Sequence, residues 1–175
     1  MASKLSRDEI LALFEALNEE LRAIDVKGHV HVAGGAVMCL ALDARASTRD
    51  VDAVFRPARA VLEAAHRVAA RRGVPDTWLN DAVKAYTSDR ATWAPFLERS
   101  HLKVFVATPE YMLAMKCLAM RTGEGYRDEE DIRYLLRNLG LTRLEDATEI
   151  LARYYPLEDY PEPTLLALRE LLSGP

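Results

Sequence analysis

Cysteine is scarce in this sequence, so disulfide bonds are not expected to stabilise the fold. The two cysteines among the 175 residues are Cys39 and Cys117, and each stands inside an apolar pattern with helical spacing. Such a setting is typical of buried thiols in a reducing compartment and not of a disulfide framework. We therefore expect a cytoplasmic protein.

Long apolar runs and a basic surplus are missing as well. No apolar stretch approaches the roughly 20 residues that a membrane-spanning helix requires. Charges interrupt the apolar pattern of the first residues, MASKLSRDEILALFEALNEEL, so we expect neither a signal peptide nor a membrane partner. The net charge is −4, which gives no general attraction to nucleic acid, although a local basic rim from Arg67, Arg71, Arg72 and Arg121 is a candidate contact for RNA.

Apolar residues make up 50% of the chain, enough for one buried core. Their spacing predicts a first helix behind a Ser6 cap, and later helices and strands in alternation. The expected strands are 29–33, 49–55 and 102–107, with short strands and loops over 74–99. The expected helices are 36–42, 58–73, 110–121, 127–140, 144–155 and 163–174. This order predicts an α/β (α+β) fold, with a small mixed sheet followed by a helical C-terminal extension.

Two carboxylates on one predicted strand are the first candidate functional feature. Side chains at i and i+2 of a strand point to the same face, so Asp50 and Asp52 share a side while Val51 and Ala53 point into the core. Neighbouring carboxylates repel unless a cation or solvent screens them, and Mg²⁺ prefers oxygen ligands of this kind. The simpler interpretation is a solvated strand end, where Asp50 caps a turn and Asp52 pairs with Arg49 or Arg56.

Two glycines precede this strand, between the strand over 29–33 and the next helix. Without Cβ atoms, Gly34 and Gly35 let backbone N–H groups approach an anion closely. A turn alone also explains a Gly-Gly pair. Together with the carboxylates, however, the glycines favour a site for a nucleoside triphosphate and its metal ion.

The segments VAGGAVMCLAL and RASTRDVDAVF resemble the Gly-Gly … Asp-x-Asp signature of the DNA-polymerase-β-like nucleotidyltransferase superfamily. More narrowly, they resemble its AbiEii-type branch, known from bacterial toxin–antitoxin and abortive-infection systems. That branch shows an Arg-x-Thr-x-Asp-x-Asp run, then a lysine on a helix, then an Arg-Asp-x-x-Asp-Ile/Leu motif. This chain has matching residues in the same order: Arg45, Ser47, Thr48, Asp50 and Asp52, then Lys116, then Arg127, Asp128 and Asp131. The arginine spacing is one residue longer than in the commonest form.

The resemblance implies a nucleotidyltransferase core over 1–107, with a helical region over 108–175 packed on it or forming one domain with it. It implies transfer of a nucleoside monophosphate from an NTP to an RNA, such as a tRNA 3′ end, or to a protein acceptor. A cognate antitoxin would neutralise such a toxin-type enzyme. Asp50 and Asp52 would hold Mg²⁺ or Mn²⁺. The predicted catalytic residues are Asp50, Asp52, Lys116 and Asp131, and the predicted nucleotide-binding residues are Gly34, Gly35, Arg45, Thr48, Lys116 and Asp128.

Simpler interpretations stand beside these roles. Lys116 fits a surface lysine on an apolar helix, and Asp128 and Asp131 fit the first turn of a helix, where acids complement the dipole. His29 and His31 share a strand face and could bind a metal, but no third ligand stands near them in the sequence. The two tryptophans, Trp78 and Trp93, are assigned to the core or an interface.

One departure from the superfamily pattern leaves a second function open. Catalytically complete members often carry a third carboxylate on a later strand. Here the strand over 102–107 offers Lys103, and Asp81 is a candidate substitute. The alternatives to an active enzyme are therefore a catalytically degenerate domain that binds a nucleotide or partner, and a purely structural protein.

Overall fold

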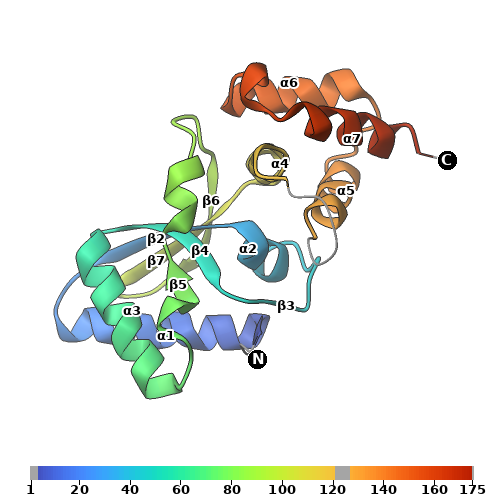
Figure 1. Ribbon diagram of the computed structural model, residues 1–175. Coiled ribbons are helices and arrows are strands. Elements are labelled where there is room, and N and C mark those ends of the chain that lie inside the picture. The colour runs from blue at the N-terminus through green and yellow to red at the C-terminus, as the bar shows by residue number, and fades with distance from the viewer. Residues whose placement is uncertain (1–3, 121–126, 175) are drawn as a thin grey trace. The chain divides into compact units, whose positions relative to one another are not determined.

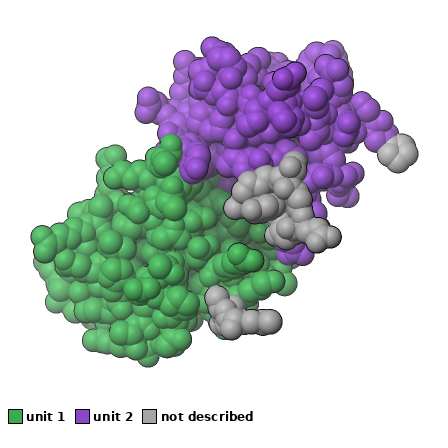
Figure 2. All heavy atoms as spheres, in the orientation of Figure 1, with its two compact units in different colours: residues 1–85, 93–107 green, residues 86–92, 108–175 purple. Residues whose placement is uncertain are grey.

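A computed structural model describes residues 4–120 and 127–174 of the chain, and Figure 1 shows its helices and strands. The chain divides into two compact units, which Figure 2 shows in different colours. Unit 1 comprises Met1–Ala85 and Trp93–Ala107, and unit 2 comprises Tyr86–Thr92 and Thr108–Pro175. The division into 1–107 and 108–175 stays a prediction.

Unit 1 is built on a five-stranded mixed sheet with the order β5-β4-β2-β7-β6. Strand β2 pairs antiparallel with β4 and parallel with β7, while β5 is parallel to β4 and β6 antiparallel to β7. Three of its strands, β2, β4 and β7, alternate buried and more exposed residues along most of their length, which is typical of a sheet with one face on the core. The strands are β2 (Gly28–Ala33), β4 (Val51–Arg56), β5 (Leu79–Asn80), β6 (Trp93–Glu98) and β7 (Leu102–Ala107).

Two helices cover the core face of this sheet, α1 (Arg7–Ala23) and α3 (Ala58–Arg72). The predicted Ser6 cap is present as a capping box, in which Ser6 Oγ accepts from the Glu9 N–H and the Glu9 carboxylate accepts from the Ser6 N–H. The apolar stripe of α1 is buried, and α3 ends at Gly73 in the left-handed conformation, as predicted. Trp78 follows in a short 3₁₀ helix, Asp76–Trp78, and is 1% exposed.

A short helix and a two-residue ladder complete unit 1. Helix α2 (Gly34–Leu40) begins directly at the end of β2, two residues earlier than predicted. The chain then returns through β3 (Ser47–Thr48), which pairs antiparallel with β1 (Leu5–Ser6). The Arg7 Nε donates to the Leu40 carbonyl at 3.2 Å. The N-terminal segment thus holds the loop that leads to the two aspartates.

Unit 2 is helical. Its helices are α4 (Pro109–Leu118), α5 (Asp128–Asn138), α6 (Leu144–Tyr154) and α7 (Glu162–Leu172). Helix α4 starts at the predicted signature, with Thr108 as the cap and Pro109 in the first turn. The hydroxyl and backbone groups of Ser88 and Thr92 hydrogen-bond to Tyr111, Tyr154 and Thr108. These bonds hold the segment 86–92 on the helices of unit 2.

The predicted fold class is confirmed, because the structure has a five-stranded mixed sheet with helices and a helical C-terminal part. In the described part of the chain, no helix combines the length and the apolar character that crossing a membrane requires.

Candidate functional site

The two aspartates lie at the start of β4, on the face of the sheet turned away from the core. Val51 and Ala53 are fully buried, whereas Asp50 and Asp52 keep part of their surface. Asp52 pairs with Ala33 of β2, so the pair stands where β2 ends and α2 begins (Figure 1). The alternation predicted from the sequence is therefore present.

The two glycines lie against this pair, and the structure shows why a residue with a Cβ atom does not fit at either position. Gly34 has φ +66°, and a Cβ there would stand 3.0 Å from Asp52 Oδ2. At Gly35 a Cβ would meet Thr48 Oγ1 at 2.9 Å and Arg45 Nη1 at 3.3 Å. The space beside the glycines is thus filled by the predicted site residues themselves. The missing side chains let Asp52, Thr48 and Arg45 converge on the backbone at the end of β2.

Thr48 positions the backbone of the first aspartate. Its side chain is buried, and its hydroxyl donates to the Asp50 carbonyl at 3.2 Å. Since Thr48 belongs to β3, the β1–β3 ladder also fixes the place of Asp50. The structure therefore gathers Gly34, Gly35, Arg45, Thr48, Asp50 and Asp52 in unit 1.

Burial and the neighbouring carboxylate of Asp52 dominate the electrostatics of Asp50. The pKa of Asp50 lies above its ordinary value, first because burial disfavours the charged form and then because Asp52 repels it. Arg49 acts in the opposite direction and is outweighed. A carboxylate pair in this condition gains most from an added cation.

Asn80 is a site residue that the sequence analysis missed. It lies on β5 in register with Asp52, and its Nδ2 approaches Asp50 Oδ2 at 3.4 Å. Its Oδ1 accepts from the Ala82 N–H at 3.1 Å, which turns the amino group toward Asp50. A single asparagine in a short, irregular segment carries no signal in the sequence, because only the pairing of β5 with β4 places it here.

The pairing of β5 with β4 shows which strand could carry a third carboxylate beside Asp50 and Asp52. The sequence analysis took the strand over 102–107 as the neighbour of the carboxylate strand. In the structure β2 lies between β7 and β4, so Lys103 is two strands away and pairs with Glu98 at 2.8 Å. The neighbour is β5, which presents Asn80, and Asp81 beyond it is exposed.

In unit 2 the structure brings the other predicted residues together. Lys116 Nζ lies 3.0 Å from Asp128 Oδ1 and 2.8 Å from Asp131 Oδ2. The side chains are 14%, 6% and 4% exposed, respectively. Lys116 is therefore not an exposed surface lysine, and the two acids at the start of α5 are more than dipole partners. The roles of these three residues toward a nucleotide stay predictions.

Two arginines of the basic rim expected from the sequence pair with the same acid. Arg67 and Arg71 of α3 both pair with Glu20 of α1, Arg67 Nε at 2.7 Å. Glu20 is buried, so the two ion pairs join the helices. Arg121 lies outside the described residues.

The carboxylates of Asp50 and Asp52 are the candidate ligands for a metal ion. Within residues 4–120 and 127–174, no three acidic, histidine or cysteine side chains gather as a metal-binding group, which applies to His29 and His31 as well. Two carboxylates do fit Mg²⁺ or Mn²⁺, since Mg²⁺ commonly takes one or two protein carboxylates and completes its shell with water and substrate phosphates. The residues present thus fit a metal ion that binds together with a nucleotide.

Comparisons with known proteins give one structural likeness. No family model matches the sequence, and a search of curated proteins yields no significant match. Among solved structures, the chain is similar to the crystal structure of an antigenic nucleotidyltransferase-like protein from Paracoccidioides brasiliensis. The two are 19% identical with a TM-score of 0.49, and the match covers 95% of each chain. The function is therefore inferred from the site itself.

Proposed function

We propose that the chain is a nucleotidyltransferase, which transfers a nucleoside monophosphate from an NTP to an RNA or protein acceptor. The observation that carries this proposal is the convergence of Asp50 and Asp52 with Gly34 and Gly35 at the end of β2. A strand end with a structural role alone does not need two neighbouring half-exposed carboxylates, one of which has its pKa raised by burial and by the charge of the other. A site for a cation that accompanies an anionic substrate does.

The residues of the candidate site in unit 1 have separate roles in this proposal. Asp50 and Asp52 hold Mg²⁺ or Mn²⁺, which when bound offsets charge on the triphosphate and polarises the reacting groups. Arg45, whose guanidinium lies beside Gly35, donates to phosphate oxygens. Thr48 and Asn80 hold Asp50 in place through its carbonyl and its carboxylate.

The reaction follows the chemistry of phosphoryl transfer. An acceptor hydroxyl oxygen forms a bond to the α-phosphorus of the NTP, and the bond from that phosphorus to the bridging oxygen of the β-phosphate breaks. Pyrophosphate leaves, and the hydroxyl proton passes to solvent. The chain contributes position and charge, because no covalent intermediate is required.

The cluster of Lys116, Asp128 and Asp131 is proposed to stabilise unit 2 in the first place. Lys116 already contacts two carboxylates, so we assign Asp128 and Asp131 the role of orienting its ammonium. Contact of Lys116 with the triphosphate remains part of the proposal. The AbiEii-type toxin role and a cognate antitoxin are also proposals, and they are supported by the motif resemblance alone.

A second candidate function is a degenerate module that binds a nucleotide without turnover. The specific observation in its favour is Asn80, a neutral side chain on the strand beside the carboxylates. With two carboxylates and one amide, the site carries less charge for a metal ion than a site with three carboxylates does.

One experiment separates these functions. The purified protein is incubated with Mg²⁺ or Mn²⁺, each α-labelled NTP, total RNA and cell extract, beside Asp50→Asn, Asp52→Asn and the matched control Asp81→Asn. Label on RNA or protein that both site variants lose and Asp81→Asn keeps is the expected result. Metal-dependent NTP binding without label establishes the degenerate module. The absence of both NTP binding and label overturns the proposal.

A further inference from the structure

The face of the sheet that carries Asp52 continues beyond the site as a row of rings. His31 of β2 lies opposite Val54 on one side and Phe105 on the other, and Phe105 pairs with Pro95 of β6. The rings of His31 and Phe105 are stacked, with centroids 4.7 Å apart and planes 9° from parallel. The Trp93 ring meets His31 edge-on at 5.2 Å. All four strands belong to unit 1.

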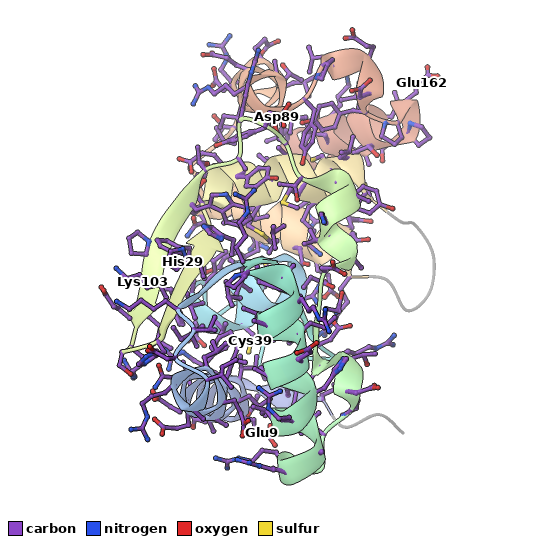
Figure 3. All side chains as sticks on the ribbon, turned by 90° about the vertical axis from the view of Figure 1, so that its left-hand side faces the viewer. Glu9, His29, Cys39, Asp89, Lys103 and Glu162 are labelled. Atoms are coloured by element: carbon purple, nitrogen blue, oxygen red, sulfur yellow. The ribbon has the colours of Figure 1, made fainter. Side chains whose placement is uncertain are left out.

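A charged row follows the ring row on the same face. His29 lies opposite Arg56 and Lys103, and Lys103 opposite Glu98. Figure 3 shows His29 and Lys103 close together on one side of the molecule. Lys103 is paired with Glu98, but within the described part of the chain no carboxylate pairs with Arg56. This end of the face is therefore cationic, although the whole chain is acidic.

Helices α1 and α3 of unit 1 pack on the other face of the sheet, and the ring side keeps part of its surface exposed. Leu21 of α1 and Val61 of α3 approach Gly28, whose side of the sheet includes Val30 and Val32. On the ring side, His29, Arg56, Pro95 and Lys103 are exposed, and His31, Val54, Trp93 and Phe105 are half-buried. Trp93 thus differs from the core tryptophan Trp78, because it is only half-buried.

The ring row suits stacking with uncharged aromatic groups. The pKa of His31 lies below its ordinary value, first because burial disfavours the charged form and then because His29 and Arg56 lie nearby. At neutral pH His31 is therefore a neutral ring beside Phe105. Val54, which ends the row on β4, is short, so a planar group beside His31 would extend the existing stack.

We propose that this ring face, formed by His31, Trp93 and Phe105 with Arg56, His29 and Lys103, binds a single-stranded nucleic acid as the acceptor. Bases stack on the rings, and phosphates lie along the cationic row. The inference rests on the proposed function, because it names the acceptor of that site. His31 stands two residues before Ala33, the partner of Asp52, so the ring row lies about 7 Å from the carboxylates.

Two features favour a nucleic acid over a protein partner. Rings beside a cationic row match bases and phosphates at once, and sequence-independent binding of single strands uses this combination. The carboxylate pair at the other end repels a polyanion, so only its terminal hydroxyl, beside a bound cation, belongs there. The strand would thus run from the cationic row across the rings toward Asp50 and Asp52.

Binding is tested first without any reaction. A short, 5′-labelled single-stranded RNA of mixed sequence is titrated in EDTA and without NTP, with anisotropy as the readout and Trp93 emission as a second one, against the constant background of buried Trp78. His31→Val and Phe105→Leu, which keep strand-forming apolar side chains, should each weaken binding about tenfold. Arg56→Gln should reduce the salt dependence by about one ion. Arg59→Gln on α3 is the matched control and should change nothing.

The outcomes separate this inference from the proposed function. Asp50→Asn should bind RNA at least as tightly as the wild type, because it removes a charge that repels phosphates. In transfer assays, His31→Val should raise KM for RNA and leave kcat unchanged. Wild-type affinity in folded His31→Val and Phe105→Leu, equal affinity for duplex RNA, or label that enters only protein overturns the ring face as acceptor site and leaves nucleotidyl transfer standing. RNA binding that depends on the rings, without label from any NTP, overturns the proposed function instead.

Discussion

The molecule contains two pairs of aspartates close in sequence, and their surroundings differ. Asp128 and Asp131, three apart on α5, are buried and share the ammonium of Lys116 at 3.0 and 2.8 Å. Asp50 and Asp52, two apart at the start of β4, keep part of their surface, and their mutual repulsion adds to the raised pKa of Asp50. The neighbours described around Asp50 are a neutral amide, Asn80, and the outweighed charge of Arg49.

The difference indicates which pair supports the fold and which is available for ligands. A buried pair of acids that shares an ammonium is stabilised by it, and removing the ammonium leaves two carboxylates close together in the interior. A half-exposed pair under repulsion is stable enough to fold, but it binds a cation more strongly than a relaxed pair does. Substitutions should therefore affect stability in unit 2 and ligand binding in unit 1.

The largest effect is expected from Lys116→Met. The substitution keeps a long apolar side chain but leaves Asp128 and Asp131 buried without their ammonium, so the free energy of unfolding should fall by about 3 kcal/mol or more. Urea denaturation followed by circular dichroism measures it. The triple variant with Asp128→Asn and Asp131→Asn should recover much of the loss, because no buried charge remains.

The control for this prediction is an ion pair on the surface of unit 2. Arg153 pairs with Glu149 at 3.4 Å, and both side chains are exposed. Arg153→Gln should therefore cost less than about 0.5 kcal/mol. A similar loss for Lys116→Met and Arg153→Gln would show that the buried cluster does not support unit 2, and the contrast between the two aspartate pairs would then fail.

A middle-sized effect is expected at Gly34, where two causes can be separated. Gly34 and Gly73 both have φ +66°, but a Cβ at Gly73 meets nothing within 4 Å, whereas at Gly34 it stands 3.0 Å from Asp52 Oδ2. Gly73→Ala should cost about 1 kcal/mol for the left-handed backbone alone. Gly34→Ala should cost about 2 kcal/mol and also weaken Mn²⁺ binding in the presence of NTP, because Asp52 must move.

Thermal unfolding and Mn²⁺ relaxation measurements test this pair of glycine variants. Equal stability losses with unchanged Mn²⁺ binding in Gly34→Ala would mean that the close approach of the glycine to Asp52 has no consequence. The comparison is sharp because both variants make the same chemical change in the same backbone conformation.

Much of the fold was predictable because its signals are local. The Ser6 cap, the left-handed Gly73 and the Thr108-Pro109 start are short patterns whose meaning depends on a few neighbouring residues. The alternation that places Asp50 and Asp52 opposite Val51 is equally local. For the same reason, the residues of the candidate site that follow each other along β3 and β4 were identified correctly as neighbours.

The rest depends on contacts between distant segments. Asn80 joins the site only because β5 pairs with β4, and Lys103 is removed from it because β2 lies between β4 and β7. The ring row needs the register of three strands to place His31, Phe105 and Trp93 together. The approach of Asp52, Thr48 and Arg45 to the two glycines likewise depends on segments that are apart in the sequence. Strand order and register are tertiary properties that a short pattern does not encode.

The smallest effect is expected from Asp50→Asn, and its sign separates function from stability. The substitution removes one of two repelling charges and keeps an oxygen that can accept from Asn80. Without metal, the variant should be more stable than the wild type at neutral pH, by a few tenths to about 1 kcal/mol, since solvent screens a half-exposed pair. Lys116→Met changes stability in the opposite direction.

The pH dependence of this gain follows from the raised pKa of Asp50. In the wild type, Asp50 takes up a proton in the folded state at a higher pH than in the unfolded state, so acidification relieves the repulsion before it protonates the unfolded chain. The advantage of Asp50→Asn should therefore shrink as the pH falls through the raised pKa toward the ordinary value of 3.8. Denaturation curves of both proteins in EDTA from neutral pH to about pH 4 measure this difference. A variant that is less stable at neutral pH would show that Asp50 stabilises the fold as the buried acids of unit 2 do. The proposal that Asp50 and Asp52 repel each other and bind a cation would then fail.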